Sequence, residues 1–285
     1  MTSKNIFNSD IHITFLGGGN MGRALIGGLL KVGLQAQQIS VIETNPETAS
    51  QLKKDFAISA IASIDAMALD GSKNNIVVMA VKPQDFKAAA QALSGRLQAS
   101  AAPLIVSIAA GIRTGDMSRW LGQTRCVRAM PNTPALIGKG ITGLFAETSV
   151  SDADRNLAEV ICNALGQTVW VDQEQLLDAV TALSGSGPAY VFAFLEALQA
   201  GGERLGLDSV TARKLAYATL EGASQLANHS AENASTLREK VTSKGGTTAA
   251  ALAVLKDLDW QAALERALAA AAERSKAMGD ELGQE

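Results

Sequence analysis

Residues 11–22 read Ile-His-Ile-Thr-Phe-Leu-Gly-Gly-Gly-Asn-Met-Gly, and this stretch decides the fold. Its first six residues form a short apolar run that ends in glycine, which is typical of a buried strand in a parallel sheet. Helix signals follow directly over residues 20–31. A strand, a glycine-rich turn and a helix in this order predict the start of a doubly wound α/β fold.

The glycines of this turn are spaced as Gly17-x-Gly19-x-x-Gly22. In a dinucleotide-binding turn, the first glycine permits the tight bend and the second admits the pyrophosphate, while the third lets helix and strand pack closely. The spacing alone is weak evidence, but its position between a predicted strand and a predicted helix is the context that the motif requires. The predicted coenzyme contacts of this turn are Leu16, Gly17, Gly18, Gly19, Asn20, Met21 and Gly22.

Strand and helix signals alternate up to about residue 170. Further short apolar runs predict strands at residues 39–42, 76–81, 104–108 and 126–130. Pro46 and Pro83 suit the first turns of helices that follow two of these strands. This alternation predicts an N-terminal Rossmann-type, doubly wound parallel sheet, which we assign to a dinucleotide-binding domain of residues 1–170.

From about residue 171 the pattern changes to helices only. Helical spacing or high alanine content predicts helices at residues 174–183, 186–205, 209–228, 235–241 and 260–278. The two long central helices carry small and apolar residues on more than one face, so they need cover on most sides. We therefore expect an all-α C-terminal dimerisation domain of residues 171–285, with a compact monomeric bundle as the alternative.

The composition is that of an ordinary globular protein, since 47% of the 285 residues are hydrophobic and 19% are charged. A formal net charge of −3 gives no basic footprint for nucleic acid. Cys126 and Cys162 form neither a disulfide framework nor a metal-ligand spacing, which fits a reducing compartment. The sequence has no apolar stretch of about 18 residues and no signal-peptide order. We expect a cytoplasmic protein without metal, nucleic-acid or membrane partners.

A second glycine-containing turn lies near the carboxyl end, where residues 243–248 read Ser-Lys-Gly-Gly-Thr-Thr before an alanine-rich helical run. Two glycines let the backbone approach a ligand closely, and the following helix presents unpaired N–H groups with positive dipole character. A small carboxylate suits such a helix start. Taken alone, the segment is more simply interpreted as a loop with a threonine N-cap.

Residues 17–22, residues 243–248 and the segment Ser184-Gly185-Ser186-Gly187-Pro188-Ala189-Tyr190 together make the chain resemble pyrroline-5-carboxylate reductase. The resemblance covers nearly the whole chain, and its late segment is specific to that family. It implies reduction of Δ1-pyrroline-5-carboxylate to L-proline by an intertwined homodimer that is often assembled into a decamer. Two other functions stay open, a reductase of a related imine acid and a dinucleotide-binding protein without turnover.

Residues 43–46, which follow the second predicted strand, bear on the choice of coenzyme. Glu43 lies about where a ribose-binding acid is expected, and an acid there favours NAD over NADP because a 2′-phosphate would face like charge. An exposed acid at a strand end is the alternative. The family more often has a neutral or basic pair here, and Thr44 or Asn45 could still bond a phosphate. We therefore expect NADPH or NADH, with contacts from Glu43, Thr44, Asn45 and Pro46.

Other strand ends are expected to line the coenzyme groove, because open parallel sheets bind ligands at their carboxyl edge. The resemblance places residues 80–83 beside the coenzyme, the loop that contains Asn132 over the nicotinamide, and Ser63 near the adenine. The alternatives are that Lys82 is merely solvated and that the loop is a rigid turn between strands. The small residues after the strand at 104–108 allow close approach to the nicotinamide ribose. These expected contacts are Ala80, Val81, Lys82, Pro83, Ile108, Ala109, Ala110, Asn132 and Ser63.

The resemblance places the substrate contacts mainly in the helical half. Glu174 falls where the family has a substrate-contacting acid, but a glutamate at a helix start is also ordinary dipole complementation. The segment 184–187 is similar to β-hydroxyacid dehydrogenases too, yet the next lysine is Lys214, so their catalytic lysine is missing and imine reduction is favoured. The expected substrate contacts are Glu174, Ser186, Gly187, Lys240, Ser243, Gly246, Thr247 and Thr248.

Thr248 is the expected catalytic residue. The pyrroline substrate already contains an imine, so the protein mainly has to position the coenzyme against the imine carbon. A threonine hydroxyl is a poor general acid, and we expect it to orient the ring nitrogen rather than to donate a proton. His12, in the first predicted strand, and His229, near a helix end, are poorly placed for acid–base work.

Overall fold

The computed structural model describes residues 10–67, 74–97 and 102–284. The chain forms two compact units: Met1–Ser186 with Ala271–Glu285, here called the sheet unit, and Gly187–Ala270, here called the helical unit. The change of sequence pattern instead predicts a boundary near residue 170. The sheet unit extends further because residues 171–186 pack on the sheet, where the buried Leu177 lies against Gly143. The division into coenzyme and substrate domains stays a prediction.

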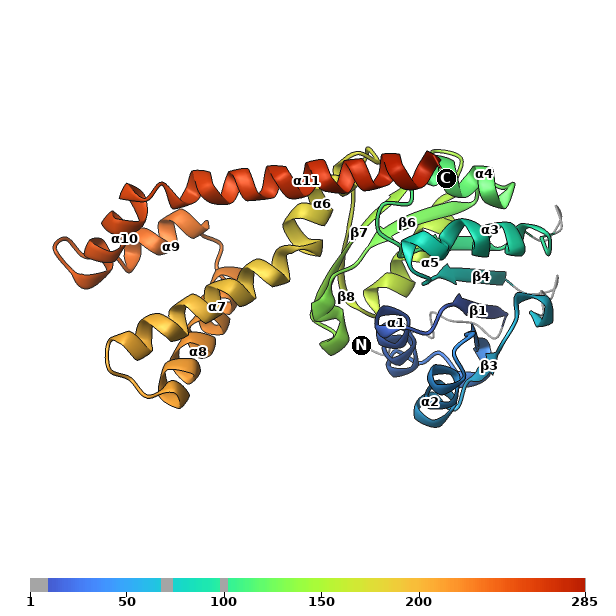
Figure 1. Cartoon of the computed structure of the whole chain (residues 1–285), viewed down its shortest axis with the longest axis horizontal. Helices are drawn as coiled ribbons and strands as arrows, with labels where there is room; N and C mark the ends of the chain where they lie inside the picture. Colours follow the sequence, from blue (N-terminus) through green and yellow to red (C-terminus); the bar gives the residue numbers. More distant parts are fainter. Residues whose placement is uncertain (1–9, 68–73, 98–101, 285) are drawn as a thin grey trace. The chain divides into compact units, whose positions relative to one another are not determined.

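The sheet unit contains an eight-stranded sheet in the order β3-β2-β1-β4-β5-β6-β7-β8 (Figure 1). Neighbouring strands pair in parallel except β6 with β7, so β7 and β8 run against the others. The predicted Rossmann-type fold is confirmed, with an added antiparallel extension. The strands are β1 Ile11–Leu16, β2 Ile39–Ile42, β3 Ser59–Ile61, β4 Asn74–Met79, β5 Leu104–Ser107, β6 Cys126–Met130, β7 Gly140–Ala146 and β8 Gly166–Trp170.

Strands β3, β7 and β8 are absent from the sequence prediction. The strand β3 has three residues, and β8 alternates between exposed and half-buried residues, so neither has the apolar run of a central strand. Two predicted strands are too long, since β4 ends at Met79 and β5 at Ser107. The residue after each strand end makes one more hydrogen bond to the neighbouring strand: Ala80 N donates to Leu16 O (2.8 Å), and Ile108 N donates to Met79 O (3.1 Å).

Helices cover both faces of the sheet. The start of α2 shows how the sequence sets these boundaries: the Asn45 side chain accepts from the N–H groups of Glu47 and Thr48 (3.0 Å each), and Pro46 needs no donor partner. The helices are α1 Asn20–Lys31, α2 Pro46–Phe56, α3 Phe86–Ser94, α4 Thr114–Leu121, α5 Asp152–Asn163 and α6 Leu176–Val180, which continues into a π-helical turn Thr181–Gly185.

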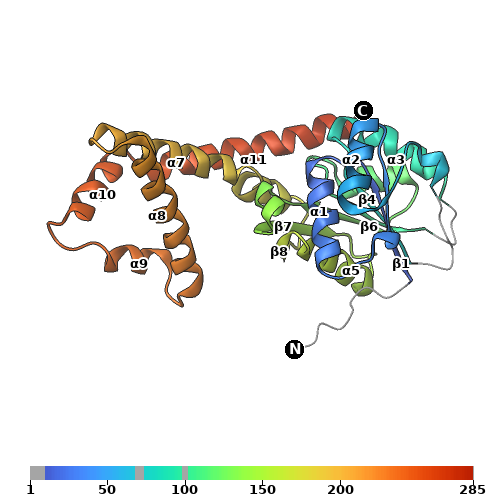
Figure 2. The same ribbon diagram turned by 90° about the horizontal axis from the view of Figure 1, so that it is seen from below.

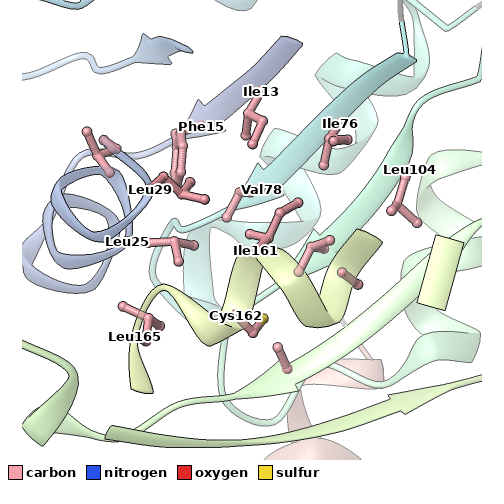
Figure 3. Close-up of a cluster of buried hydrophobic side chains, with 14 of the residues drawn as sticks. Ile13, Phe15, Leu25, Leu29, Ile76, Val78, Leu104, Ile161, Cys162 and Leu165 are labelled. Carbon is pink, nitrogen blue, oxygen red and sulfur yellow. The ribbon is translucent and has the colours of Figure 1, made fainter. Parts of the chain in front are cut away.

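Two hydrophobic clusters hold the sheet unit together, one on each face of the sheet. On one face, Leu29 of α1 and Ile161 of α5 are fully buried in the same cluster as Phe15 of β1 (Figure 3). On the other face, Phe86 of α3 packs on Trp120 of α4, with ring centroids 6.1 Å apart. Both faces are therefore closed by elements of the unit itself.

The last helix, α11 Trp260–Gln284, ends in the sheet unit. The Arg113 Nη2 atom lies 2.7 Å from Asp280 Oδ1, and Arg119 Nη2 donates to the Gly283 carbonyl over 2.8 Å. A Cβ atom on Gly279 would come within 3.1 Å of the Arg113 guanidinium. Two arginines near α4 thus fix the carboxyl end of the chain.

The helical unit consists of α7 Gly187–Arg204, α8 Ser209–His229, α9 Ala234–Lys240, α10 Thr247–Asp257 and the first part of α11 (Figures 1 and 2). Helix α8 starts at the predicted cap, since the Asp208 carboxylate accepts from Thr211 N over 3.0 Å. Within this fully described unit, only Leu195, Ala212 and Ala216 are buried. The helices are correctly predicted, but they enclose almost no core within one chain.

None of the helices that the structure describes is long and apolar enough to cross a membrane. The described residues also contain no group of three or more His, Cys, Asp or Glu side chains that could hold a metal ion.

Candidate functional site

The glycine turn between β1 and α1 has the geometry predicted for a dinucleotide-binding turn: a tight bend, close packing of helix on strand, and space for a pyrophosphate. Gly17 has φ = +97°, and a Cβ atom there would come within 2.7 Å of the Ala80 carbonyl oxygen. A Cβ atom on Gly22 would come within 2.9 Å of the Gly17 carbonyl oxygen. A Cβ atom on Gly19 would meet nothing within 4 Å, so this position leaves space for a ligand against the backbone.

The amino end of α1 is free to bind an anion. Gly19 occupies the N-cap position in extended conformation, and no side chain caps the helix. The first N–H groups of α1 are therefore available, and they carry the positive end of the helix dipole. A pyrophosphate fits such a helix start.

Glu43, directly after β2, is tied to the glycine turn. One carboxylate oxygen, Oε2, accepts from Gly18 N over 2.9 Å, and the other, Oε1, accepts from Asn45 N over 2.8 Å. The Glu43 N–H donates to the Ile61 carbonyl over 2.9 Å, which continues the pairing of β2 with β3. The acid therefore has a fixed position at the carboxyl edge of the sheet.

A cavity of about 540 Å³ lies beside this turn, within the size range of small-molecule and cofactor sites. Nine predicted coenzyme contacts line it: Leu16, Gly17, Gly19, Glu43, Thr44, Ser63, Ala80, Val81 and Lys82. The lining also includes seven residues that sequence reasoning missed: Ile42, Ala62, Ile64, Asp65, Asp85, Ala89 and Ala92. Several of these follow β3, which was not predicted, and two face the cavity from α3.

The remaining predicted coenzyme contacts are not among the residues lining this cavity. They are Gly18, Asn20, Met21, Gly22, Asn45, Pro46, Pro83, Ile108, Ala109, Ala110 and Asn132. Two of them have defined structural tasks, since Asn45 caps α2 and the Asn132 Oδ1 atom accepts from Ile141 N over 3.0 Å. The Asn132 side chain thereby holds the start of β7 beside the loop that follows β6.

Glu174 lines a second cavity of about 570 Å³ in the sheet unit. Its carboxylate accepts from Thr114 N (2.8 Å), from Thr114 Oγ1 (2.9 Å) and from Arg128 Nη1 (3.1 Å). Arg128 is buried, with 4% of its side chain exposed. Glu174 therefore caps the first residue of α4 and neutralises a buried arginine, and its predicted contact with substrate stays a prediction.

The two motif segments expected to bind substrate fall at helix starts. The π-helical turn includes Ser184, whose Oγ atom donates to the Val180 carbonyl over 3.1 Å, and Gly187 begins α7 two residues after the turn ends. Ser186 forms the junction, where its N–H donates to the Thr181 carbonyl over 2.8 Å. Turns of this kind are frequent at functional sites.

The segment 243–248 forms a turn into α10 within the helical unit. Gly245 has φ = +73°, and Gly246 N donates to the Ser243 carbonyl over 3.0 Å. Gly246 is the N-cap and no side chain caps α10, so the N–H groups of Thr247 and Thr248 are open to an anion. Lys240 is an exposed cation, whose Nζ atom is 2.6 Å from Glu232 Oε1.

The two cysteines are not candidate nucleophiles. Burial raises the pKa of Cys126 and of Cys162 to about 12, so both thiols stay protonated at neutral pH. Cys162 lies on the buried side of α5 and belongs to the first hydrophobic cluster (Figure 3).

Comparison with known proteins shows that the glycine turn after β1 and the turn at 243–248 occur in one family. The chain is 43% identical to a pyrroline-5-carboxylate reductase of Pseudomonas aeruginosa over 273 residues, which covers 95% of this chain and 98% of that protein. The chain belongs to the pyrroline-5-carboxylate reductase family. A solved pyrroline-5-carboxylate reductase from Coxiella burnetii has 38% identity and a TM-score of 0.88, covering 95% of this chain and 99% of that one.

Family models divide between the two halves of the chain. A model described as NADP oxidoreductase coenzyme F420-dependent matches residues 12–111, which contain the glycine turn and Glu43. A model described as pyrroline-5-carboxylate reductase dimerisation matches residues 174–278, which contain the turn at 243–248. A pyrroline carboxylate reductase structure from Plasmodium falciparum with NADP bound is 28% identical, with a TM-score of 0.82 and coverage of 96% and 100%. Use of a nicotinamide coenzyme thus fits the cavity beside Gly19.

Proposed function

We propose that the chain reduces Δ1-pyrroline-5-carboxylate to L-proline with NADH or NADPH, the last step of proline biosynthesis. The observation that carries this proposal is the open helix start and the 540 Å³ cavity beside Gly19, in a chain that matches pyrroline-5-carboxylate reductases over 95% of its length. The coenzyme, when bound, supplies the hydride. The tasks left to the protein are binding, orientation and control of charge.

The proposed coenzyme site follows from the sheet edge. The α1 N-terminus receives the pyrophosphate, Glu43 and Thr44 hold the adenosine ribose, and Ser63 lies toward the adenine. The segment Ala80-Val81-Lys82 also lines the cavity. The other predicted contacts, including residues 108–110 and Asn132, are proposed to reach the nicotinamide end.

The proposed substrate site uses the start of α10. The open N–H groups beside Gly246 receive the substrate carboxylate, as a helix N-terminus does for small anions. Thr248 is half-buried in the first turn, where its hydroxyl can bond the ring nitrogen and hold the imine in one orientation. Further contacts are proposed for Glu174, Ser186, Gly187, Lys240, Ser243 and Thr247.

We also propose that the protein is a cytoplasmic homodimer, which could assemble further into a decamer. The support is the exposure of large apolar side chains across the helical unit. Large contiguous apolar surface marks an interface. Examples with exposed fractions of 59, 53, 53, 58 and 50% are Phe192, Phe194, Leu215, Val254 and Trp260.

The proposal is tested by following loss of nicotinamide absorbance when the pyrroline substrate is added, with each coenzyme in turn. A five-membered ring is expected to give a higher kcat/KM than its six-membered homologue. A higher kcat/KM for the six-membered ring would indicate a reductase of a related imine acid. Unchanged absorbance with both coenzymes would refute the proposal that the protein is a reductase.

Thr248→Ala is expected to lower kcat by about 10- to 100-fold while coenzyme affinity stays near wild type, because the hydroxyl acts on the ring and not on the coenzyme. Ser243→Ala, in the same turn, is the matched control and is expected to have the smaller effect. Unchanged turnover in Thr248→Ala would remove this hydroxyl from the mechanism.

A further inference from the structure

Glu43 is held by the backbone on both oxygens of its carboxylate. Gly18 N binds Oε2 over 2.9 Å and Asn45 N binds Oε1 over 2.8 Å. An unrestrained glutamate at a strand end could rotate away from an incoming ligand. Here rotation would break two hydrogen bonds to a charged acceptor and leave two backbone donors without partners.

The glycine at position 18 makes this arrangement possible. A Cβ atom there would collide with the Leu52 side chain, and it would lie 3.3 Å from Glu43 Oε2 and 3.4 Å from Val41 Cγ1. Gly18 is not one of the three spaced glycines of the dinucleotide-binding turn. Its need for a hydrogen side chain comes instead from close approach to α2 and to Glu43.

The cavity beside Glu43 is acidic. Its described lining residues include three acids, Glu43, Asp65 and Asp85, and a single cation, Lys82. None of these lining residues is an arginine, the side chain that accommodates a 2′-phosphate in NADP-binding relatives of this fold. The Asn45 Oδ1 atom already accepts from two N–H groups at the start of α2. A 2′-phosphate next to Glu43 would therefore meet like charge without a matching cation.

We infer that Glu43, locked by Gly18 and Asn45, makes this reductase selective for NADH over NADPH. The carboxylate accepts from the 2′-hydroxyl of an NADH ribose, and it repels the 2′-phosphate that takes the place of this hydroxyl in NADPH. This inference rests on the proposed function only for the statement that the bound coenzyme is used for turnover. The preference itself is a property of the cavity.

Calorimetric titration of the full-length protein with NAD⁺ and with NADP⁺ measures the preference without any turnover. NAD⁺ is expected to bind about tenfold tighter or more, since a like charge at a ribose-binding position costs at least this much. Equal or tighter binding of NADP⁺ would overturn the inference. Absence of measurable binding by either dinucleotide would overturn it as well, because the cavity would then not be the coenzyme site.

Two substitutions at the same position separate charge from structure. Glu43→Gln keeps the size of the side chain and removes its charge, whereas Glu43→Ser replaces it with a short neutral side chain that cannot reach both backbone donors. Each is expected to reduce the NAD⁺/NADP⁺ affinity ratio by about tenfold. The matched control is Asp85→Asn, which removes another acid of the same lining without disturbing the locked carboxylate, and its ratio is expected to change less than in either Glu43 variant.

Gly18→Ala tests the lock, because the added Cβ atom would collide with the Leu52 side chain and lie 3.3 Å from Glu43 Oε2, so the turn has to shift against α2 and Glu43 while the charge remains. The affinity ratio is expected to fall toward that of Glu43→Gln. An unchanged ratio in both Glu43→Gln and Gly18→Ala would assign the preference to other residues. Kinetics with the pyrroline substrate distinguishes the two proposals: turnover that favours NADPH overturns this inference alone, whereas dinucleotide binding without turnover overturns the proposed function alone.

Discussion

The sheet unit and the helical unit differ in how much of their apolar surface one chain buries. In the sheet unit, strands and helices of one chain close two hydrophobic clusters on the two faces of the sheet. The helical unit buries three residues and exposes apolar side chains such as Leu205 (88%) and Val210 (78%). A single layer of helices cannot cover faces that are apolar on several sides.

In the proposed homodimer, this difference separates the stability that one chain supplies from the stability that depends on a second copy. Burial of Leu29 or Ile161 is complete in one chain, so its contribution does not depend on protein concentration. Side chains of the helical unit gain the same contribution only when another molecule covers them. Their stability is then coupled to assembly by mass action.

The strongest test of the contrast is Phe192→Asp on α7, at a residue that is 59% exposed. We expect the oligomer to dissociate and activity to fall by about 100-fold or more, because a charge cannot be buried unpaired in an apolar interface. Light scattering after gel filtration measures the assembly. The matched control is Glu196→Gln on the same helix, also exposed, which should keep both assembly and activity. An active, fully assembled Phe192→Asp protein would contradict the role given to this face.

Equal leucine truncations compare the two units directly. Leu29→Ala removes a fully buried side chain from the first cluster and is expected to lower the free energy of unfolding by about 2–5 kcal/mol. Leu215→Ala, on an exposed face of α8, is expected to act through assembly, so its effect on denaturant midpoints should shrink as the protein is diluted. Equal losses at every protein concentration would mean that Leu215 stabilises the single chain and does not act through assembly.

The smallest expected difference between the two units is in how much an ion pair contributes to the free energy of unfolding. The guanidinium of Arg125 holds the pKa of the Asp154 carboxyl below its usual range, through hydrogen bonds of 2.7 and 2.8 Å. This stabilisation is complete above the unfolded pKa of about 3.9 and is lost as the pH falls through the lower folded pKa. Asp154→Asn should therefore cost about 1 kcal/mol at neutral pH, reduced by screening at a guanidinium that is 39% exposed, and should flatten the acid limb of the stability curve.

The comparison pair in the helical unit is Glu232 with the exposed Lys240. Glu232→Gln is expected to change the free energy of unfolding by less than about 0.5 kcal/mol at any pH, because exposed pairs contribute little. Denaturant titration between acid and neutral pH measures both variants. An acid limb in Asp154→Asn as steep as in wild type would rule out this carboxyl as a source of acid sensitivity.

The sequence was most informative where structure is local. The strand β1, the helix α1 and the cap of α8 lie at the residues that periodicity and capping rules indicate. The position of Glu43 after β2 also follows from chain order. Its hydrogen bond from Gly18 N could not be predicted, because the two residues are 25 positions apart. The pairing of β1 with β2 that brings them together does not follow from the sequence of either segment.

Long-range contacts account for most of what the sequence did not reveal. Glu174 accepts hydrogen bonds from Thr114 and Arg128, which are 60 and 46 positions away in the sequence. Its role as a cap and counter-ion therefore could not be predicted from the residues around it. Strands β7 and β8 were missed because glycine and threonine interrupt the apolar residues of β7, and because β8 alternates between exposed and half-buried residues. The cavity residues after β3 and on α3 were missed because they are defined by a shared wall and not by a motif.

The central claim, that this chain passes a hydride to the imine carbon of a pyrroline carboxylate, is tested most directly with NADH that carries deuterium at both positions of nicotinamide C4. Mass spectrometry of the product should find one deuterium per molecule of L-proline, on the ring carbon that belonged to the imine, formed mole for mole with oxidised coenzyme. Unlabelled proline, or coenzyme that binds and is never oxidised in the presence of the substrate, would contradict the account.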